Sequence, residues 1–190
     1  MSSLEKEIAS KLKKLNKTLS IAESCTGGSI CSKIVSNPGA STYFKGGVVC
    51  YSTESKVNIL GIDRDLIEKK SVVSVEVAEM MVKKVKKMFN TDFAIATTGN
   101  IGPTKGDSDA PIGKVYISFA NNEIINTLEF DFQGEREFII KKVVEKTFEL
   151  LNDKLDNGLF ILQKVDFILA TLYDENRDGL RKCIVTQFAE

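Results

Sequence analysis

Helical and strand-like patterns alternate along most of this sequence, and the alternation limits the folds that the chain can adopt. An amphipathic helix with one buried stripe is predicted by the spacing of Leu4, Ile8, Leu12 and Leu15, which have Lys and Glu between them. A short strand is predicted directly after it, at 18–22. A helix followed at once by a strand is the building unit of α/β proteins.

The same alternation continues to residue 151. Further helices are predicted around Ile30–Val35, around Lys56, from Ser74 to Phe89 and from Glu135 to Leu151. In the last of these, the residues expected to point inward are Phe138, Ile139, Val143, Phe148 and Leu151. Strands are predicted at 48–51, 93–97, 114–120 and 123–132. The apolar run Phe93–Thr97 is typical of a central strand buried on both faces. The last two strands follow one another as a hairpin. The order predicts a three-layer α/β/α sandwich with a mixed, mostly parallel sheet.

Length and charge restrict the class of protein. A chain of 190 residues suffices for one α/β domain and is too short for two. Lys plus Arg and Asp plus Glu balance at 26 each, so we expect no nucleic-acid partner, and we interpret the lysines at 83–87 as a solvated helix face. No apolar run approaches the ~18 residues of a membrane span, and the first residues are charged. We therefore expect a cytoplasmic protein without a membrane partner.

Two segments are distinguished within the chain. Residues 1–152 form the predicted domain, and 153–190 form a C-terminal extension. Because Leu159–Tyr173 is apolar on most sides, we expect a helix there that packs on the domain or on a second subunit, in a homodimer. Asp174–Gly179 matches the first half of a calcium-binding loop, but Val185 stands where a bidentate glutamate is needed, so we predict a polar turn.

Histidine is absent, which excludes Ser-His-Asp and Cys-His catalysis and zinc sites with imidazole ligands. A nucleophilic enzyme built from this chain needs Lys, Tyr or a carboxylate as its general base. Cys25, Cys31, Cys50 and Cys183 contain no CxxC pair, which disfavours a four-thiolate metal site or a redox centre and favours reduced thiols. We expect neither a metal nor a cofactor.

A glycine-rich loop follows the first predicted strand and opens the next helix. Gly27 and Gly28 let the backbone approach a phosphate or a developing oxyanion, although turn geometry alone also explains them. The spacing matches neither the P-loop nor the Rossmann fingerprint. Ser24 either presents a nucleophilic hydroxyl at the strand exit or caps the helix. Cys25 is the rival nucleophile, and it needs the helix terminus or Lys56 to lower its thiol pKa.

Two further candidate regions follow later strands. Tyr51 ends one strand and Lys56 lies about a turn into the next helix, so both can face one cleft, where a lysine shielded from water becomes a usable base. A surface lysine is the ordinary alternative. The loop Thr98–Pro103 follows the buried central strand. Because ligands gather beyond the carboxyl ends of strands in α/β sheets, these loops together predict one site.

Motifs spread over most of the chain then identify a family. They are, in order, Ala22–Gly28, Gly46–Val49, Tyr51-Ser52, Lys56, Leu60-Gly61, Val73-Ser74, Thr98–Pro103, Pro111–Val115 and Phe132–Arg136. The series resembles the C-terminal domain of the CinA family over residues 4 to 152, with ESCTGG and TG…GP as its most specific parts. The large N-terminal domain of full-length CinA is not in the sequence, which suggests the stand-alone form.

The resemblance implies a metal-independent nicotinamide-nucleotide amidase, which converts nicotinamide mononucleotide to nicotinic acid mononucleotide and ammonia. The family's serine, tyrosine and lysine fall on Ser24, Tyr51 and Lys56, as nucleophile, proton relay or orienting group, and general base. Arg136 is either a phosphate contact or a surface cation. The residues expected to bind the nucleotide are Cys25, Thr26, Gly27, Gly28, Gly46, Gly47, Thr98, Gly99, Gly102 and Arg136.

The sequence also departs from the family pattern around the expected pocket. Ile101 stands where a small residue is usual, Ile140 stands where arginine is frequent, and the loop 104–110 carries Asp107 and Asp109. These departures favour an alternative, a nucleotide-binding or interaction module of the competence- and damage-related CinA family that has lost the chemistry. Hydrolysis of a phosphate ester or pyrophosphate is less favoured, because no clustered carboxylates offer a metal site.

Overall fold

The computed structural model describes residues 4–104 and 108–175, and these contain a five-stranded sheet. Its strands are β1 (Leu19–Glu23), β2 (Phe44–Val49), β3 (Phe93–Gly99), β4 (Lys114–Ala120) and β5 (Ile125–Asp131). They lie in the order β2-β1-β3-β4-β5. β1 pairs in parallel with β2 and β3, whereas β4 is antiparallel to both of its neighbours. The predicted mixed sheet is confirmed.

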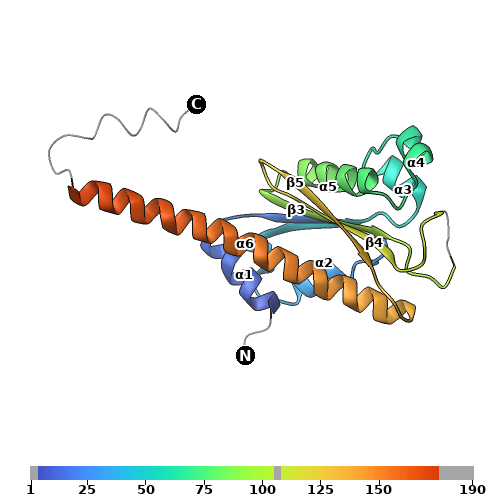
Figure 1. Ribbon diagram of the computed structural model, residues 1–190, viewed down its shortest axis with the longest axis horizontal. Coiled ribbons are helices and arrows are strands. Elements are labelled where there is room, and N and C mark those ends of the chain that lie inside the picture. Colours follow the sequence, from blue (N-terminus) through green and yellow to red (C-terminus); the bar gives the residue numbers. More distant parts are fainter. Residues whose placement is uncertain (1–3, 105–107, 176–190) are drawn as a thin grey trace.

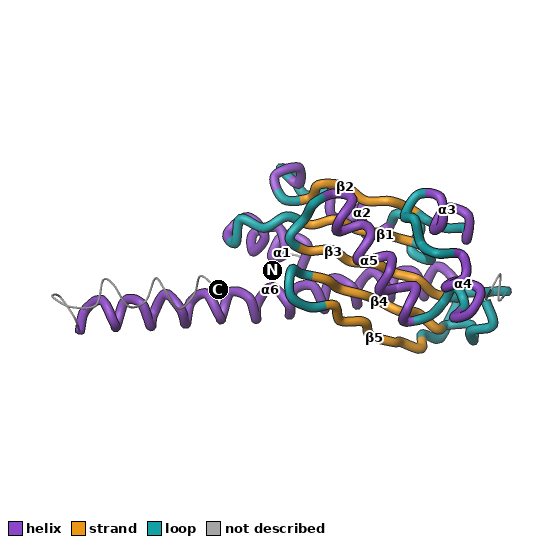
Figure 2. The backbone as a smooth tube through the Cα atoms, turned by 90° about the horizontal axis from the view of Figure 1, so that it is seen from above, coloured by secondary structure: helices purple, strands orange, loops and turns teal. Residues whose placement is uncertain are grey.

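Helices cover both faces of this sheet. They are α1 (Leu4–Lys14), α2 (Ser29–Val35), α3 (Thr53–Asn58), α4 (Arg64–Lys70), α5 (Val75–Phe89) and α6 (Arg136–Glu175), with a 3-10 turn η1 at Ala40–Thr42. Figures 1 and 2 show α5 across one face and α1, α2 and α6 against the other, which confirms the three layers. Ser74 caps α5 as predicted, because its hydroxyl accepts the amide hydrogen of Val77 at 3.2 Å.

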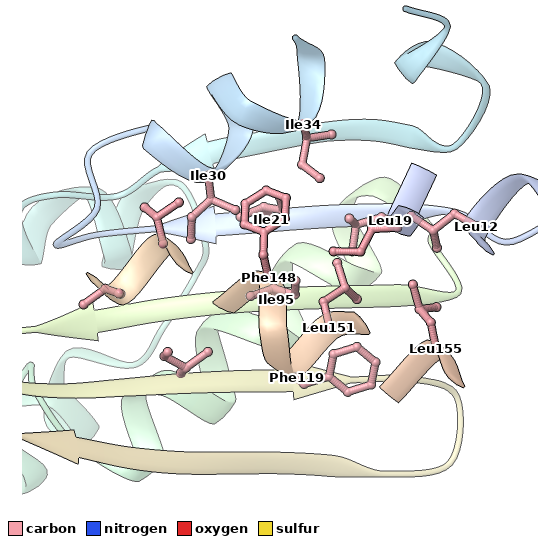
Figure 3. Packing of buried hydrophobic residues seen from close by; sticks show 14 of the residues in the cluster. Leu12, Leu19, Ile21, Ile30, Ile34, Ile95, Phe119, Phe148, Leu151 and Leu155 are labelled. Carbon is pink, nitrogen blue, oxygen red and sulfur yellow. The ribbon is translucent and has the colours of Figure 1, made fainter. Parts of the chain in front are cut away.

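Alternate residues of the strands supply two hydrophobic cores. On the face of α1, α2 and α6, Ile21 and Ile95 pack with Phe148 and Leu151 (Figure 3). On the opposite face the strands present small residues, which let α5 approach the sheet closely. These residues are Ala22, Ala94, Ala96 and Ala120. The central strands β1 and β3 are therefore buried on both faces, as the apolar run at 93–97 predicts.

β2 corrects the prediction for the first glycine pair. The strand was expected at 48–51 with Gly46 and Gly47 before it, but it begins at Phe44 and contains both glycines. A Cβ atom at Gly46 would lie 2.3 Å from Cε1 of Phe89 on α5, and one at Gly47 would lie 2.4 Å from Sγ of Cys31 on α2. The two glycines therefore allow helices from both layers to approach an edge strand.

α6 is longer than the helix predicted to end at Leu151. It is a single helix of 40 residues, on the order of 60 Å long, and its distal part extends beyond the sheet (Figure 1). Leu155 is still buried in the domain core, and Lys11 of α1 pairs with Asp156. The proposed domain boundary at 152/153 thus falls inside a continuous helix and stays a prediction.

Two further predictions concern the ends of α6. Phe138 was expected to point inward, but it is 50 % exposed in the first turn of the helix and lies against Lys142, 5.5 Å from the ring centroid to Nζ. The predicted polar turn at 174–179 overlaps the end of α6 at Glu175, and residues 176–179 lie outside the described part. Within that part, no helix has the length and apolar character needed to cross a bilayer.

Candidate functional site

A cleft of about 270 Å³ opens where β1, β2 and β3 end. All three strands are parallel, so their carboxyl ends meet at this edge of the sheet. The described residues that line it are Ser24, Cys25, Tyr51, Ser52, Thr53, Lys56, Val72, Val73, Thr98, Gly99, Asn100, Ile101, Gly102, Thr104, Ser108 and Arg136. The predicted convergence of three loops on one site is therefore present.

Ser24 and Lys56 are in direct contact inside this cleft. Nζ of Lys56 donates to Oγ of Ser24 at 2.9 Å and to the carbonyl oxygen of Cys50 at 2.8 Å. Lys56 is only 1 % exposed, although it belongs to the six-residue helix α3, whose N-terminus is capped by the hydroxyl of Ser52. The surface-lysine alternative is therefore wrong. A hydroxyl and an amine in contact form a nucleophile–base pair of the kind that acyl transfer requires.

Glu23 fills the N-terminus of α2. Its carboxylate accepts the amide hydrogens of Gly28 at 2.9 Å, Ile30 at 3.1 Å and Cys31 at 2.8 Å. Gly28 was expected to offer its amide to a phosphate or an oxyanion, and this expectation is corrected because the amide already has an acceptor. The same contacts show that Glu23, and not Ser24, closes this helix end.

The remaining amides of the loop divide into two groups. The amide of Gly27 donates to the carbonyl oxygen of Ser24 at 3.1 Å, so it too is used inside the protein. In the described part of the chain, the amides of Cys25 and Thr26 have no main-chain or carboxylate acceptor. The hydroxyl of Thr26 lies 2.8 Å from that of Thr97 and faces the end of β3.

The Cys25 thiol is a poor nucleophile. It is 4 % exposed, and burial raises its pKa to about 12 even though the nearby Lys56 acts in the opposite direction. Burial and the carboxylate of Glu23 likewise raise the pKa of Cys31. Because only the thiolate attacks carbonyl carbons effectively, the hydroxyl of Ser24 is the better nucleophile in this cleft.

Tyr51 and Arg136 lie together at the rim of the cleft. One guanidinium nitrogen of Arg136 donates to the phenol oxygen of Tyr51 at 2.9 Å, and another donates to the carbonyl oxygen of Gly102 at 2.5 Å. Tyr51 is 60 % exposed. Since Ser24 and Lys56 touch directly, no proton relay through this phenol is needed between them.

The third loop closes one side of the cleft. Asn100, which the sequence did not single out, donates its side-chain amide to the carbonyl oxygen of Ala110 at 2.9 Å and accepts from the amide of Gly102 at 3.4 Å. Thr98 donates to the carbonyl oxygen of Val72 at 2.9 Å, which joins this loop to the segment before α5. The Asn100–Gly102 contact is local, of a kind that asparagine commonly makes in turns, whereas the Thr98–Val72 contact joins segments 26 residues apart, which no local signal could have marked.

The predicted site residues therefore separate into two sets. Those that line the cleft are Ser24, Cys25, Tyr51, Lys56, Thr98, Gly99, Gly102 and Arg136. Those that are not among its lining residues are Thr26, Gly27, Gly28, Gly46 and Gly47. Within residues 4–104 and 108–175, no three His, Cys, Asp or Glu side chains gather as a metal site would need.

The fold and the cleft define a three-layer α/β/α domain with a buried Ser–Lys pair at the carboxyl edge of its sheet. The chain belongs to the CinA family, because the model of the CinA C-terminal domain matches residues 1–155. A CinA-like protein of Flavobacterium psychrophilum is 49% identical over 134 residues, which are 70% of this chain and 32% of that protein. The chain spans about a third of the length of such curated relatives.

Solved structures show the same fold. A CinA superfamily protein of Klebsiella pneumoniae superposes with a TM-score of 0.78 at 28% identity, covering 81% of this chain and 96% of that one. The competence/damage inducible protein CihA of Agrobacterium tumefaciens gives a TM-score of 0.74 at 26% identity, over 82% and 99% of the two chains. The predicted family and fold are thereby confirmed.

Proposed function

We propose that this chain is an amidohydrolase that converts nicotinamide mononucleotide to nicotinic acid mononucleotide and ammonia. The observation that carries the proposal is the 2.9 Å contact between Ser24 Oγ and the buried Nζ of Lys56. A hydroxyl becomes a competent nucleophile when an adjacent base can take its proton, and a chain without histidine must use another base. The resemblance to nicotinamide-nucleotide amidases supplies the substrate.

The reaction proceeds in two halves. Ser24 Oγ attacks the carboxamide carbon while its proton passes to the neutral form of Lys56 Nζ, and the amide of Cys25, a residue of the cleft lining, stabilises the oxyanion. The C–N bond then breaks as Lys56 returns that proton to the leaving nitrogen, which departs as ammonia. Water attacks the resulting ester as Lys56 takes a proton from it, and Lys56 then gives that proton to Ser24 Oγ as the C–O bond to serine breaks, which releases Ser24 and the carboxylic acid.

The nucleotide phosphate belongs at the rim of the cleft. The N-terminus of α2 is occupied by Glu23, so it has no room for a second anion. Arg136 lines the cleft and offers a guanidinium that suits bidentate contact with phosphate oxygens, with Tyr51 beside it. We assign Arg136 to the phosphate, and Val72, Val73 and Ile101 to the flat pyridine ring.

The proposal is tested by release of ammonia from nicotinamide mononucleotide. The wild-type protein should release it, and Ser24→Ala and Lys56→Ala variants should lose about 10³-fold or more of the rate while remaining folded. Lys84→Ala, on α5 away from the cleft lining, is the matched lysine control and should keep full activity. Full activity in Ser24→Ala would refute the nucleophile. Tight binding of the mononucleotide without ammonia release would instead support the binding-module alternative.

A further inference from the structure

We propose that Glu23 is a positioning residue that holds the Ser24 hydroxyl against Lys56 without contacting substrate itself. This inference rests on the proposed function, because it takes Ser24 as the nucleophile. Glu23 is the last residue of β1, is 0 % exposed and is not among the residues that line the cleft. A carboxylate withdrawn from water is very costly unless hydrogen bonds compensate it, so its partners indicate its role.

Those partners all belong to the start of α2. One carboxylate oxygen of Glu23 accepts from the amides of Gly28 and Ile30, and the other accepts from the amide of Cys31. The first amides of a helix have no acceptor within the helix, and the positive end of the helix dipole, which lies there, attracts an anion. Glu23 therefore acts as a built-in anion that ties the end of β1 to the start of α2.

The loop between these two elements carries Ser24 and is held at both ends. At its start, the amide of Ser24 donates to the carbonyl oxygen of Thr97 on β3 at 3.0 Å. At its end, Gly28 is bound by the carboxylate of Glu23, only five residues back in sequence. The hydroxyl contact between Thr26 and Thr97 fixes the middle. Removal of the carboxylate would release one end of the loop and leave Ser24 free to shift from Lys56.

Glu23→Gln tests this role in the full chain. Glutamine has the same size, but its NH₂ group replaces one accepting oxygen and faces an amide hydrogen. We expect kcat for ammonia release to fall about 10²-fold, the loss that a displacement of the reacting group by about 1 Å causes, and KM to change less than about twofold. Asp63→Asn is the matched control, because it makes the same change at the N-cap of α4, and it should change neither constant.

A second measurement does not depend on amidase activity. In a Ser24→Cys variant the new thiol lies beside Lys56 Nζ, which can take the thiol proton and leave a thiolate paired with the resulting ammonium, so iodoacetamide should alkylate it readily. Adding Glu23→Gln should slow this alkylation at least about tenfold. Glu23→Gln also removes a negative charge near the thiol, and this effect alone would favour the thiolate and speed alkylation. Slower alkylation therefore indicates that the thiol has moved away from Lys56. Tandem mass spectrometry separates position 24 from Cys25 and Cys31.

The outcomes separate the two proposals. If the wild-type protein releases no ammonia, the amidase proposal fails, while the alkylation rates still decide whether Glu23 positions residue 24. Unchanged or faster alkylation after Glu23→Gln overturns the positioning role, as does an unchanged kcat in an active enzyme. If Glu23→Gln does not fold, Glu23→Asp, which keeps the charge but is one methylene too short to reach all three amides, should give the same slowing.

Discussion

Gly46→Ala distinguishes packing from ligand binding at the first glycine pair. The added Cβ would lie 2.3 Å from Cε1 and 2.8 Å from Cζ of Phe89, whereas carbon atoms in contact lie about 3.5–4.0 Å apart. The ring must therefore move by more than about 1 Å, and overpacking of this kind costs about 1–3 kcal/mol. The φ of +149° at Gly46 is also one that L residues rarely adopt, which adds about 1–3 kcal/mol.

Together these effects predict that Gly46→Ala lowers the free energy of unfolding by about 2–6 kcal/mol, or Tm by about 4–24 °C. Urea denaturation and calorimetry measure the loss, and KM for the mononucleotide should not change. Gly27→Ala is the comparison, because its φ is +60° and no atom lies within 4 Å of the added Cβ, so it should cost only about 1–2 kcal/mol. If Gly46→Ala costs no more than Gly27→Ala, or raises KM at full stability, the packing argument is wrong.

Two further predictions concern titrating groups. Because the pKa of Cys25 is about 12, native protein at pH 8 should alkylate there about 10³-fold more slowly than unfolded protein, and equal rates would restore Cys25 as a rival nucleophile. Burial alone would raise the pKa of Asp92, but hydrogen bonds from Thr18 and Lys17 outweigh it and lower the pKa. Asp92 therefore stabilises the fold at neutral pH, and this contribution is lost as pH falls through its folded pKa. Asp92→Asn should cost about 1–3 kcal/mol at pH 7 by urea denaturation, and a deficit that stays constant below about pH 4 would contradict this assignment.

Local signals explain what the sequence predicts correctly. The N-cap at Ser74 and the buried run at 93–97 depend on neighbours in sequence, and the structure has both. Gly46 and Gly47 were placed wrongly, because a glycine pair is typical of turns and the real cause is the approach of distant Phe89 and Cys31. The Thr98–Val72 contact was missed for the same reason, since Val72 lies in the segment before α5, 26 residues back in the chain.

The Ser24–Lys56 contact was predicted, but the sequence did not reveal that the start of α2 is occupied by the carboxylate of Glu23. A glycine-rich loop before a helix usually signals an anion site, and only the structure shows that Glu23 already supplies the anion. An open helix start beside Ser24 would attract a phosphate to the place where the carboxamide must lie. Under the proposed function, Glu23 fills that position from within, which leaves the cationic rim at Arg136 for the phosphate and the Ser24–Lys56 pair for the amide. On the proposed function, Glu23 thus determines the direction in which the nucleotide enters the cleft, as well as the position of the nucleophile.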